Sequence, residues 1–309
     1  MDKVLFLSAP LKERIWGGSY FKEVLNVTKS EEKIGEMWSL SAHPEGESIV
    51  LNGEYKNLPL SEVYRLYPEV FGNPKSKEFP ILVKLIATSD DLSIQVHPDD
   101  EYARVNENQF GKTEGWLILD SKDGSIVIGH NAKNKEELTE YIKNDNYDEL
   151  LNTRKVSVGE FYPINSGTVH ALGKNLVIME IQQSSDVTYR VYDYHRKDKF
   201  GNERELHVQK AIDVINYLPV NSEVPNYFKT NKKEIELWDN KYFTVNLLNV
   251  NGVSFIDCNF DYAIVSVCTG NIEVEGRKLK QGDSFIITSA ADILSLKGKG
   301  KVTITISKI

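Results

Sequence analysis

The chain has 309 residues, of which 40% are hydrophobic and 27% are charged, and its formal net charge is −8. This composition is ordinary for a folded globular protein, and the length allows two domains or one large β domain with an appendage. An acidic chain without basic runs argues against nucleic acid as the main partner, although a local Arg and Lys cluster could still bind an anionic substrate.

Membrane and secretory features are also not indicated by the sequence. No stretch approaches the roughly 20 apolar residues of a membrane span, and the apolar run at the N-terminus is too short for a signal peptide. Cys258 and Cys268 are too few for a disulfide framework. We therefore expect a cytoplasmic protein with no membrane partner.

Strands predominate among the predicted elements. Short apolar runs bounded by turn residues predict strands at residues 79–87, 115–120, 175–181 and 242–250. Helices are fewer and are indicated by capping residues and by acidic residues in first turns. They are predicted after Ser61 (62–66), after Pro98 (99–104), after Asn134 with Glu137 as a capping box, and over residues 203–217. The sequence therefore predicts an antiparallel β protein with helical insertions.

The chain contains a weak internal repeat. Residues 156–164 and 279–287 each combine a polar turn, a glycine followed by an acidic residue, and a strand. When the two copies are aligned on their glycines, Ile293 of the second stands where the first has His170.

The repeat divides the chain in two. We predict a larger first domain at residues 1–230 and a smaller β domain at residues 231–309 that carries no metal site. The polar stretch at residues 220–230, flanked and interrupted by proline, is the predicted linker.

Four residues form a candidate metal site. Gln95 and His97 are two apart in a strand-like segment, so their side chains project from the same face. Glu114 and His170 would complete the set, which suits Zn²⁺, with Mn²⁺ or Fe²⁺ as alternatives. A single buried histidine is more often a hydrogen-bonded core residue, and the remaining histidines, which lack a partner pattern, are assigned to structural or surface roles. These are His43, His130, His195 and His207.

The arrangement of these residues resembles a known fold. A strand with x-Gln-x-His-x, a following Glu and a later Gly-x-x-His form the two-motif pattern of the cupin jelly roll. The chain departs from the general pattern at Gln95, where most cupins have histidine, and at Asn165, where proline is usual. These departures point to a narrower family.

Several motifs resemble type I mannose-6-phosphate isomerase, most closely its short bacterial form. They are Leu-Ser-Ile-Gln-Val-His-Pro-Asp at 92–99, Gly-Lys-Thr-Glu at 111–114, the segment 182–194, Trp-Gly-Gly at 16–18, and the segment 35–44. The resemblance spans residues 5 to about 200. It implies a mainly β cupin jelly roll with helical insertions, followed by a smaller cupin-like β domain. It also implies interconversion of mannose 6-phosphate and fructose 6-phosphate, with one Zn²⁺ held by Gln95, His97, Glu114 and His170.

The chemistry of such an isomerase requires a base. A proton must move between C2 and C1 through an enediolate, which a Lewis-acidic metal stabilises. Glu180, expected at the end of a strand, is one candidate, and a solvated strand-end acid is the alternative. Lys112 lies two residues before Glu114, hence on the same face. A cation beside it would depress its pKa and make it a base, and an electrostatic contact to substrate hydroxyls is the alternative.

A sugar-phosphate substrate also requires cations and hydroxyls. Arg190 is the first candidate for a forked contact to phosphate. Ser93 lies on the same face as Gln95, and Arg196 lies where longer family members have a phosphate-binding lysine. Lys84 lies on an otherwise apolar predicted strand, where a buried lysine needs a partner, so a substrate contact or a snorkelling side chain is expected.

Two other classes of function were considered. A cupin oxygenase using Fe²⁺ would have a more open, three-ligand site and no need of a phosphate clamp. A cupin that binds sugar phosphate without turnover would not need Lys112 and Glu180. Within the isomerase class, glucose 6-phosphate is the closest rival substrate, and the sequence does not indicate an oligomeric state.

Overall fold

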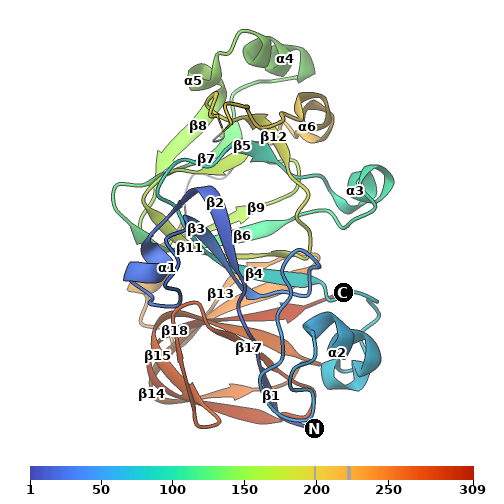
Figure 1. Ribbon diagram of the computed structural model, residues 1–309, viewed down its shortest axis with the longest axis vertical. Coiled ribbons are helices and arrows are strands. Elements are labelled where there is room, and N and C mark those ends of the chain that lie inside the picture. The colour runs from blue at the N-terminus through green and yellow to red at the C-terminus, as the bar shows by residue number, and fades with distance from the viewer. Residues whose placement is uncertain (198–199, 221–223) are drawn as a thin grey trace.

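The computed structural model of the chain describes residues 1–197, 200–220 and 224–309. Across these residues the strands form three sheets, whose paired strands are antiparallel. Figure 1 shows the sheets one above another, with the C-terminal strands at the bottom and helices at the top. The mainly β prediction is confirmed.

Two of these sheets form a jelly roll. The six-stranded sheet has the order β2-β3-β4-β11-β6-β9 and the five-stranded sheet has the order β12-β5-β10-β7-β8. The first contains β2 (Leu11–Gly18), β3 (Ile34–Leu40), β4 (Ile81–Ala87), β11 (Leu176–Gln183), β6 (Glu114–Ser121) and β9 (Phe161–Ile164). The second contains β12 (Tyr189–Tyr192), β5 (Ile94–Val96), β10 (His170–Leu172), β7 (Ser125–His130) and β8 (Leu151–Lys155). A shared apolar core that includes Trp116, Ile118 and Ile128 joins their inner faces.

The third sheet is built from the C-terminal strands and one N-terminal strand. Its order is β1-β17-β15-β18-β14-β13, with β16 paired to β15. The strands are β1 (Val4–Phe6), β13 (Glu234–Asp239), β14 (Phe243–Asp257), β15 (Ala263–Val274), β16 (Arg277–Lys280), β17 (Ser284–Ile287) and β18 (Ile293–Ser307). Leu85 and Met179 of the six-stranded sheet share a core with Val245 and Ile264 of the third sheet. The domain boundary at residue 230 stays a prediction, and β1 draws the N-terminus into the C-terminal sheet.

Helices cover the outer face of the five-stranded sheet. Leu138, Leu150 and Ile212, from three helices, share an apolar core with Ile94 and Val96 of β5. The helical segments in the described residues are α1 (Tyr20–Glu23), α2 (Leu60–Leu66), η1 (Pro68–Phe71), α3 (Asp100–Asn106), α4 (Lys135–Lys143), α5 (Tyr147–Leu150), α6 (Val208–Val214) and η2 (Tyr227–Lys229). In the same described ranges, no helix has the length and apolarity to cross a membrane.

The helix starts predicted from capping residues agree with the structure in some cases and differ in others. Asn134 is the N-cap of α4 and accepts a hydrogen bond from its first turn, as predicted. Asp99, which was predicted to lie in the first turn of a helix starting at Pro98, is instead the N-cap of α3 and accepts from Tyr102 N. The N-cap prediction at Ser61 was wrong, because α2 begins at Leu60 and Pro59 occupies the N-cap. The helix predicted over 203–217 is confined to α6, because the backbone N–H of His207 donates to Arg190 O and ties the preceding segment to β12. Part of the predicted linker, residues 221–223, lies outside the described residues.

The strand predictions and the repeat have structural counterparts. The four predicted strands overlap β4, β6, β11 and β14, although β11 and β14 run on beyond the predicted ends, to Gln183 and Asp257. Gly159 and Gly282 have φ values of 91° and 89°, so both copies of the repeat turn through the left-handed region. His170 and Ile293 each begin a strand, but His170 is fully buried whereas Ile293 is 54% exposed.

Candidate active site

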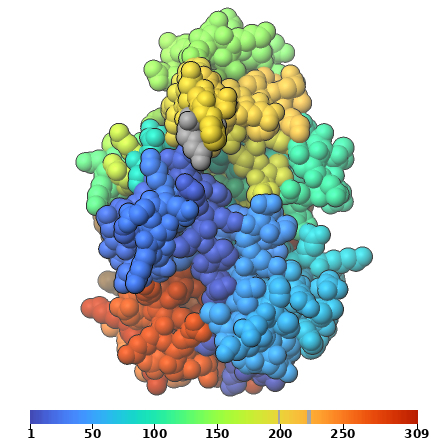
Figure 2. Space-filling model, viewed as in Figure 1, coloured from blue at the N-terminus to red at the C-terminus, as the bar shows by residue number. Residues whose placement is uncertain are grey.

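A cavity of about 500 Å³ is lined by residues of both jelly-roll sheets. Strands β2, β3, β4 and β11 contribute one wall, and β5 and β12 contribute to the other. In the space-filling view, the blue N-terminal segments lie on the same face as yellow segments that follow β12 (Figure 2). The lining is rich in charge: Lys12, Arg14, Lys84, Lys112, Arg190 and Arg204 with Glu36, Glu45, Glu180 and Asp186.

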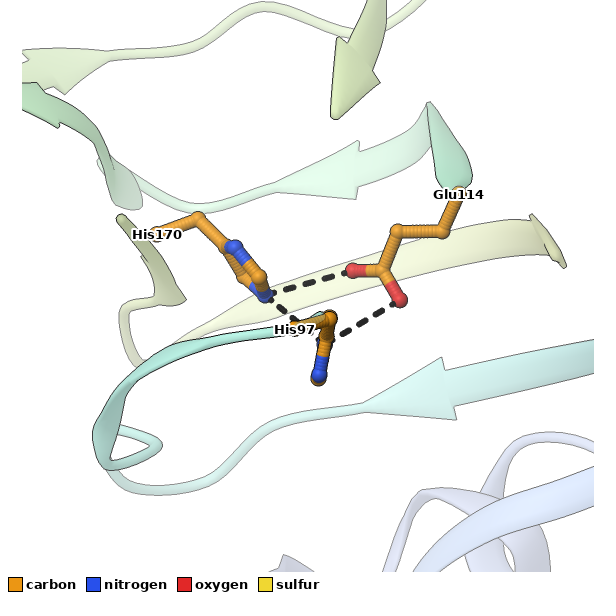
Figure 3. A group of neighbouring side chains, drawn as sticks. All are labelled: His97, Glu114 and His170. Atoms are coloured by element: carbon orange, nitrogen blue, oxygen red, sulfur yellow. Dashed lines mark hydrogen bonds and ion pairs between the residues drawn. The ribbon is translucent and has the colours of Figure 1, made fainter. Parts of the chain in front are cut away.

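Three predicted metal ligands meet beside this cavity. His97, Glu114 and His170 are buried, and their ligand atoms lie within 4.8 Å of one another (Figure 3). The two Nε2 atoms are 3.1 Å apart, and the Glu114 oxygens lie 3.4 Å from His170 Nε2 and 3.6 Å from His97 Nε2. Bonds of about 2.0–2.2 Å to a tetrahedral zinc ion separate its ligands by about 3.3–3.6 Å. The spacing fits a small divalent cation.

Hydrogen bonds orient both imidazoles toward Glu114. His97 Nδ1 lies 2.8 Å from Val187 O, and His170 Nδ1 lies 2.8 Å from Thr168 O. Because a carbonyl oxygen only accepts, each Nδ1 carries the proton and each Nε2 presents a lone pair. Burial, the largest influence, lowers the pKa of both rings and favours the neutral form that metals bind.

Glu114 supplies the anionic member of the set. Its side chain is fully buried, and neither carboxylate oxygen accepts a hydrogen bond, although Oε2 forms an ion pair with Lys112 at 2.8 Å. Buried carboxylate oxygens ordinarily have donors or cations around them. A cation between Glu114 and the two imidazoles would satisfy this requirement, so the donor set fits a metal.

Gln95 occupies the position expected from its spacing to His97. It pairs with His170 across β5 and β10 and with Arg190 across β5 and β12. Its amide nitrogen lies 3.3 Å from His170 Nε2. Rotation of the amide by 180° exchanges nitrogen for oxygen, which would direct a ligand atom at the metal position.

Lys112 lies between the cavity and the cluster of His97, Glu114 and His170. Its Nζ lies 2.8 Å from Glu114 Oε2 and 3.2 Å from His97 Nε2. Burial opposes its charge, but Glu114 and Glu180 together raise the pKa of Lys112 above its usual value. The depressed pKa predicted from the sequence presupposes a cation bound beside Lys112 and stays a prediction.

Glu180 lies within β11, not at its end as expected. Its cross-strand neighbours are Lys84 and Trp116, and it is only 4% exposed. Lys84 Nζ lies 2.9 Å from Glu180 Oε2, and the Trp116 indole N–H donates to Oε1 at 3.0 Å. Burial alone would raise the pKa of Glu180, but Lys84 and then Lys112 hold it below its usual value. The cavity wall thus contains a buried carboxylate that is ionised at neutral pH.

The candidate phosphate residues divide into two groups. Ser93, Arg190 and Lys84 line the cavity. Arg196 is not among the lining residues, and its guanidinium is bound to Asp193 and to the carbonyl of Asp91. Lys84 has the partners that a buried lysine needs, because it also donates to Gln182 at 2.6 Å.

Comparisons with known proteins agree with this geometry. Residues 4–130 match the family model "Phosphomannose isomerase type I, catalytic domain", and residues 233–307 match "Mannose-6-phosphate isomerase, cupin domain". A mannose-6-phosphate isomerase of Streptococcus mutans is 40% identical over 293 residues, which cover 93% of each chain. This chain belongs to the type I mannose-6-phosphate isomerase family. The family assignment and the predicted cupin architecture are confirmed.

Two proteins of Bacillus subtilis extend the comparison. Mannose-6-phosphate isomerase ManA is 40% identical, with 95% of this chain and 96% of ManA covered. A crystal structure of the mannose 6-phosphate isomerase from Bacillus subtilis has a TM-score of 0.91 at 37% identity and covers 98% of this chain and 99% of that chain. The relation to this isomerase family therefore extends over both the jelly roll and the C-terminal sheet.

Sequence reasoning missed several charged residues of this family member's cavity. Glu36 is 7% exposed. Its carboxylate accepts two hydrogen bonds from the Arg14 guanidinium, at 2.9 and 2.8 Å, and one from the Trp38 indole N–H at 2.7 Å. A charged residue inside an otherwise apolar strand suggested a site role for Lys84, and the same pattern was present at Glu36. Arg204 was hidden in the overlong helix prediction and gave no such signal.

Proposed function

We propose that this protein is a metal-dependent aldose–ketose isomerase that interconverts mannose 6-phosphate and fructose 6-phosphate through an enediol. The observation that carries the proposal is the His97, Glu114 and His170 cluster, which adjoins a charged cavity through Lys112. Membership of the isomerase family supports the reaction, and the arginine-containing lining supports a phosphorylated substrate rather than the substrate of an oxygenase.

The proposed metal is one Zn²⁺, held by Gln95, His97, Glu114 and His170. Two imidazoles, one carboxylate and one amide oxygen suit a zinc ion with borderline character. When bound, the metal supplies Lewis-acid stabilisation of the substrate oxygens at C1 and C2. The hydrogen bonds of His97 and His170 to backbone carbonyls hold both rings in the binding orientation.

Glu180 is the proposed base that takes the proton from C2 and returns it at C1. It is ionised, lines the cavity, and is held in one orientation by Lys84 and by Trp116. Lys112 is the proposed electrostatic partner of the substrate oxygens, since it lines the cavity and its Nζ lies 2.8 Å from Glu114 Oε2. The structure thus favours the carboxylate over the lysine as the proton acceptor.

Arg190 and Ser93 are proposed to bind the phosphate group. Arg190 is the cross-strand neighbour of Gln95 on β12, and Ser93 is two residues before Gln95, so both line the cavity beside the metal cluster. Lys84 uses contacts to Glu180 and Gln182 and lines the same cavity, so one ammonium N–H remains for a substrate hydroxyl. Arg196, which does not line the cavity, is the least supported of the proposed phosphate residues.

A coupled assay on metal-analysed protein tests the proposal. Mannose 6-phosphate and glucose 6-phosphate are supplied in parallel to protein with a measured Zn²⁺ content. We expect turnover of mannose 6-phosphate, about one Zn²⁺ per chain, loss of activity with a chelator and recovery on adding Zn²⁺. Failure of metal-loaded protein to convert mannose 6-phosphate would refute the isomerase proposal, and full activity in metal-free protein would refute the metal.

A further inference from the structure

We propose that Arg204, held in place by Asp193, is a second arginine that binds the substrate's phosphate and selects phosphorylated over unphosphorylated sugars. The inference rests on the proposed function, because it assumes that a sugar phosphate occupies the cavity. Arg204 lines that cavity together with Arg190 and Ser93. It lies in a segment without regular secondary structure before α6, and no motif marks it.

Asp193 fixes the plane of the Arg204 guanidinium. Arg204 Nε donates to Asp193 Oδ2 at 2.6 Å, and Nη2 donates to Oδ1 at 2.5 Å. Asp193 itself follows the last residue of β12 and is only 4% exposed, so it is a rigid support. This fork uses one edge of the guanidinium and leaves Nη1 available for another acceptor.

The same short segment also orients Arg190. Arg190 Nη1 donates to the carbonyl of Glu205 at 2.7 Å, and the backbone N–H of His207 donates to Arg190 O at 2.7 Å. Among the described residues, the buried Nε of Arg190 has no hydrogen-bond partner. The contact to Glu205 therefore sets the direction of the Arg190 guanidinium.

The charged groups around Arg204 favour an anion. Asp193 is the carboxylate bound by Arg204 and Arg196, and Arg190 interacts electrostatically with all three groups. Arg190 and Arg204 are the two of these arginines that line the cavity, and the single carboxylate of Asp193 lies beside them, which favours an anionic ligand group there.

Arg196 serves as a comparison for Arg204 within the same protein. It contacts the same carboxylate, forms an ion pair with Asp90 at 3.7 Å, and does not line the cavity. If the second cation at the phosphate is Arg204, then Arg204→Gln should weaken substrate binding more than Arg196→Gln. The resemblance to longer family members predicts the opposite order.

The experiment measures kcat and KM for mannose 6-phosphate in wild-type protein and in Arg204→Gln, Arg204→Lys, Arg196→Gln and Arg104→Gln. Arg104→Gln removes the same charge from the exposed face of α3, outside the cavity. Because a hydrogen bond to a charged group is lost, Arg204→Gln should raise KM about 10- to 100-fold, with kcat within about threefold. Arg204→Lys should recover part of the loss, and Arg104→Gln should match the wild type.

Calorimetry separates this inference from the proposed function. Metal-loaded protein is titrated with a hexitol phosphate and with the corresponding hexitol, neither of which can isomerise. Arg204→Gln should reduce the preference for the phosphorylated ligand by the same factor as it raises KM. Asp193→Asn should do so more weakly, with kcat preserved and the metal content unchanged.

The outcomes are distinct. An unchanged preference in a folded Arg204→Gln protein, or a larger effect of Arg196→Gln, would overturn the role of Arg204. If Arg204→Gln does not fold, the graded Arg204→Lys variant decides, since an unchanged KM there also overturns it. Wild-type protein that binds the hexitol phosphate through Arg204 but fails to isomerise mannose 6-phosphate would refute the reaction and leave the phosphate site standing.

Discussion

Replacing Lys84 by methionine would leave Glu180 without its closest cation. Lys84 and Glu180 are 6% and 4% exposed, and their charged atoms lie 2.9 Å apart, so water does not screen the pair. Glu180 would keep the Trp116 hydrogen bond and the more distant charge of Lys112. Breaking a buried pair on one side costs about 3–5 kcal/mol of unfolding free energy. Lys84→Met should therefore be destabilised by about that amount at pH 7.

The loss should depend on pH in a defined direction. Lys84 helps to lower the folded-state pKa of Glu180, so this stabilisation is present above the unfolded pKa and is lost as pH falls through the folded pKa. In Lys84→Met the pKa of Glu180 rises, and the carboxylate takes up a proton at a higher pH than in the wild type. The stability difference between the two proteins should therefore be largest near neutrality and shrink on acidification.

Equilibrium urea unfolding would measure this difference, followed in parallel by tryptophan fluorescence and circular dichroism to verify one transition. The double variant Lys84→Met/Glu180→Gln removes both charges and should be more stable than the sum of the single effects predicts. Lys143→Met, on the exposed face of α4, is the control and should change stability by less than about 0.5 kcal/mol. The reasoning would be refuted if the unfolding free energy of Lys84→Met lay within about 1 kcal/mol of the wild-type value. It would also be refuted if the effects of the two single substitutions simply added in the double variant.

Three further predictions concern catalysis, the metal and the packing of the third sheet. Glu180→Gln should retain Zn²⁺ and lose about two to four orders of magnitude in kcat, and exchange of the C2 hydrogen with deuterated solvent at the wild-type rate would exclude it as the base. Chelation should lower the melting temperature of the wild type, and Zn²⁺ should restore it, as scanning calorimetry would show. Gly282→Ala should lower the free energy of unfolding in urea by about 2–4 kcal/mol, since φ is +89° and the new Cβ would lie 2.1 Å from Met37 Cε. Gly276→Ala, at φ +75° with no neighbour within 4 Å, should lose only about 1 kcal/mol, and equal losses would contradict the packing argument.

The sequence was informative where two functional residues share one strand or one short extended segment. Gln95 and His97 both contact His170 because alternate residues of a strand face the same side. Lys112 and Glu114 meet at 2.8 Å for the same reason. Spacing within a segment could therefore be converted directly into geometry. The long-range combination with Glu114 and His170 was proposed from residue type, and the resemblance implied the same set.

The rest depended on contacts that spacing does not encode. The position of Glu180 inside β11 follows from a strand that runs on to Gln183, so the predicted strand end was too early. Arg204 reaches the cavity only because Asp193 binds it across 11 positions of sequence. The segment before α6 is held by a backbone bond from His207 to Arg190, and a local helix signal could not reveal that restraint.

The pairing of β1 with β17 has a consequence for biosynthesis. Val4, Leu5 and Phe6 lie opposite Ile287, Ile286 and Phe285, so β1 pairs with a strand that is synthesised about 280 residues after it. Until then the edge of β17 does not exist, and the three apolar residues of β1 lack their native partners. A ribosome adds about 5–20 residues each second, so this interval lasts roughly 15–60 seconds. Completion of the C-terminal sheet therefore waits for the synthesis of β17, and a fragment that begins after β1 would expose β17 as an unpaired edge open to association with other chains.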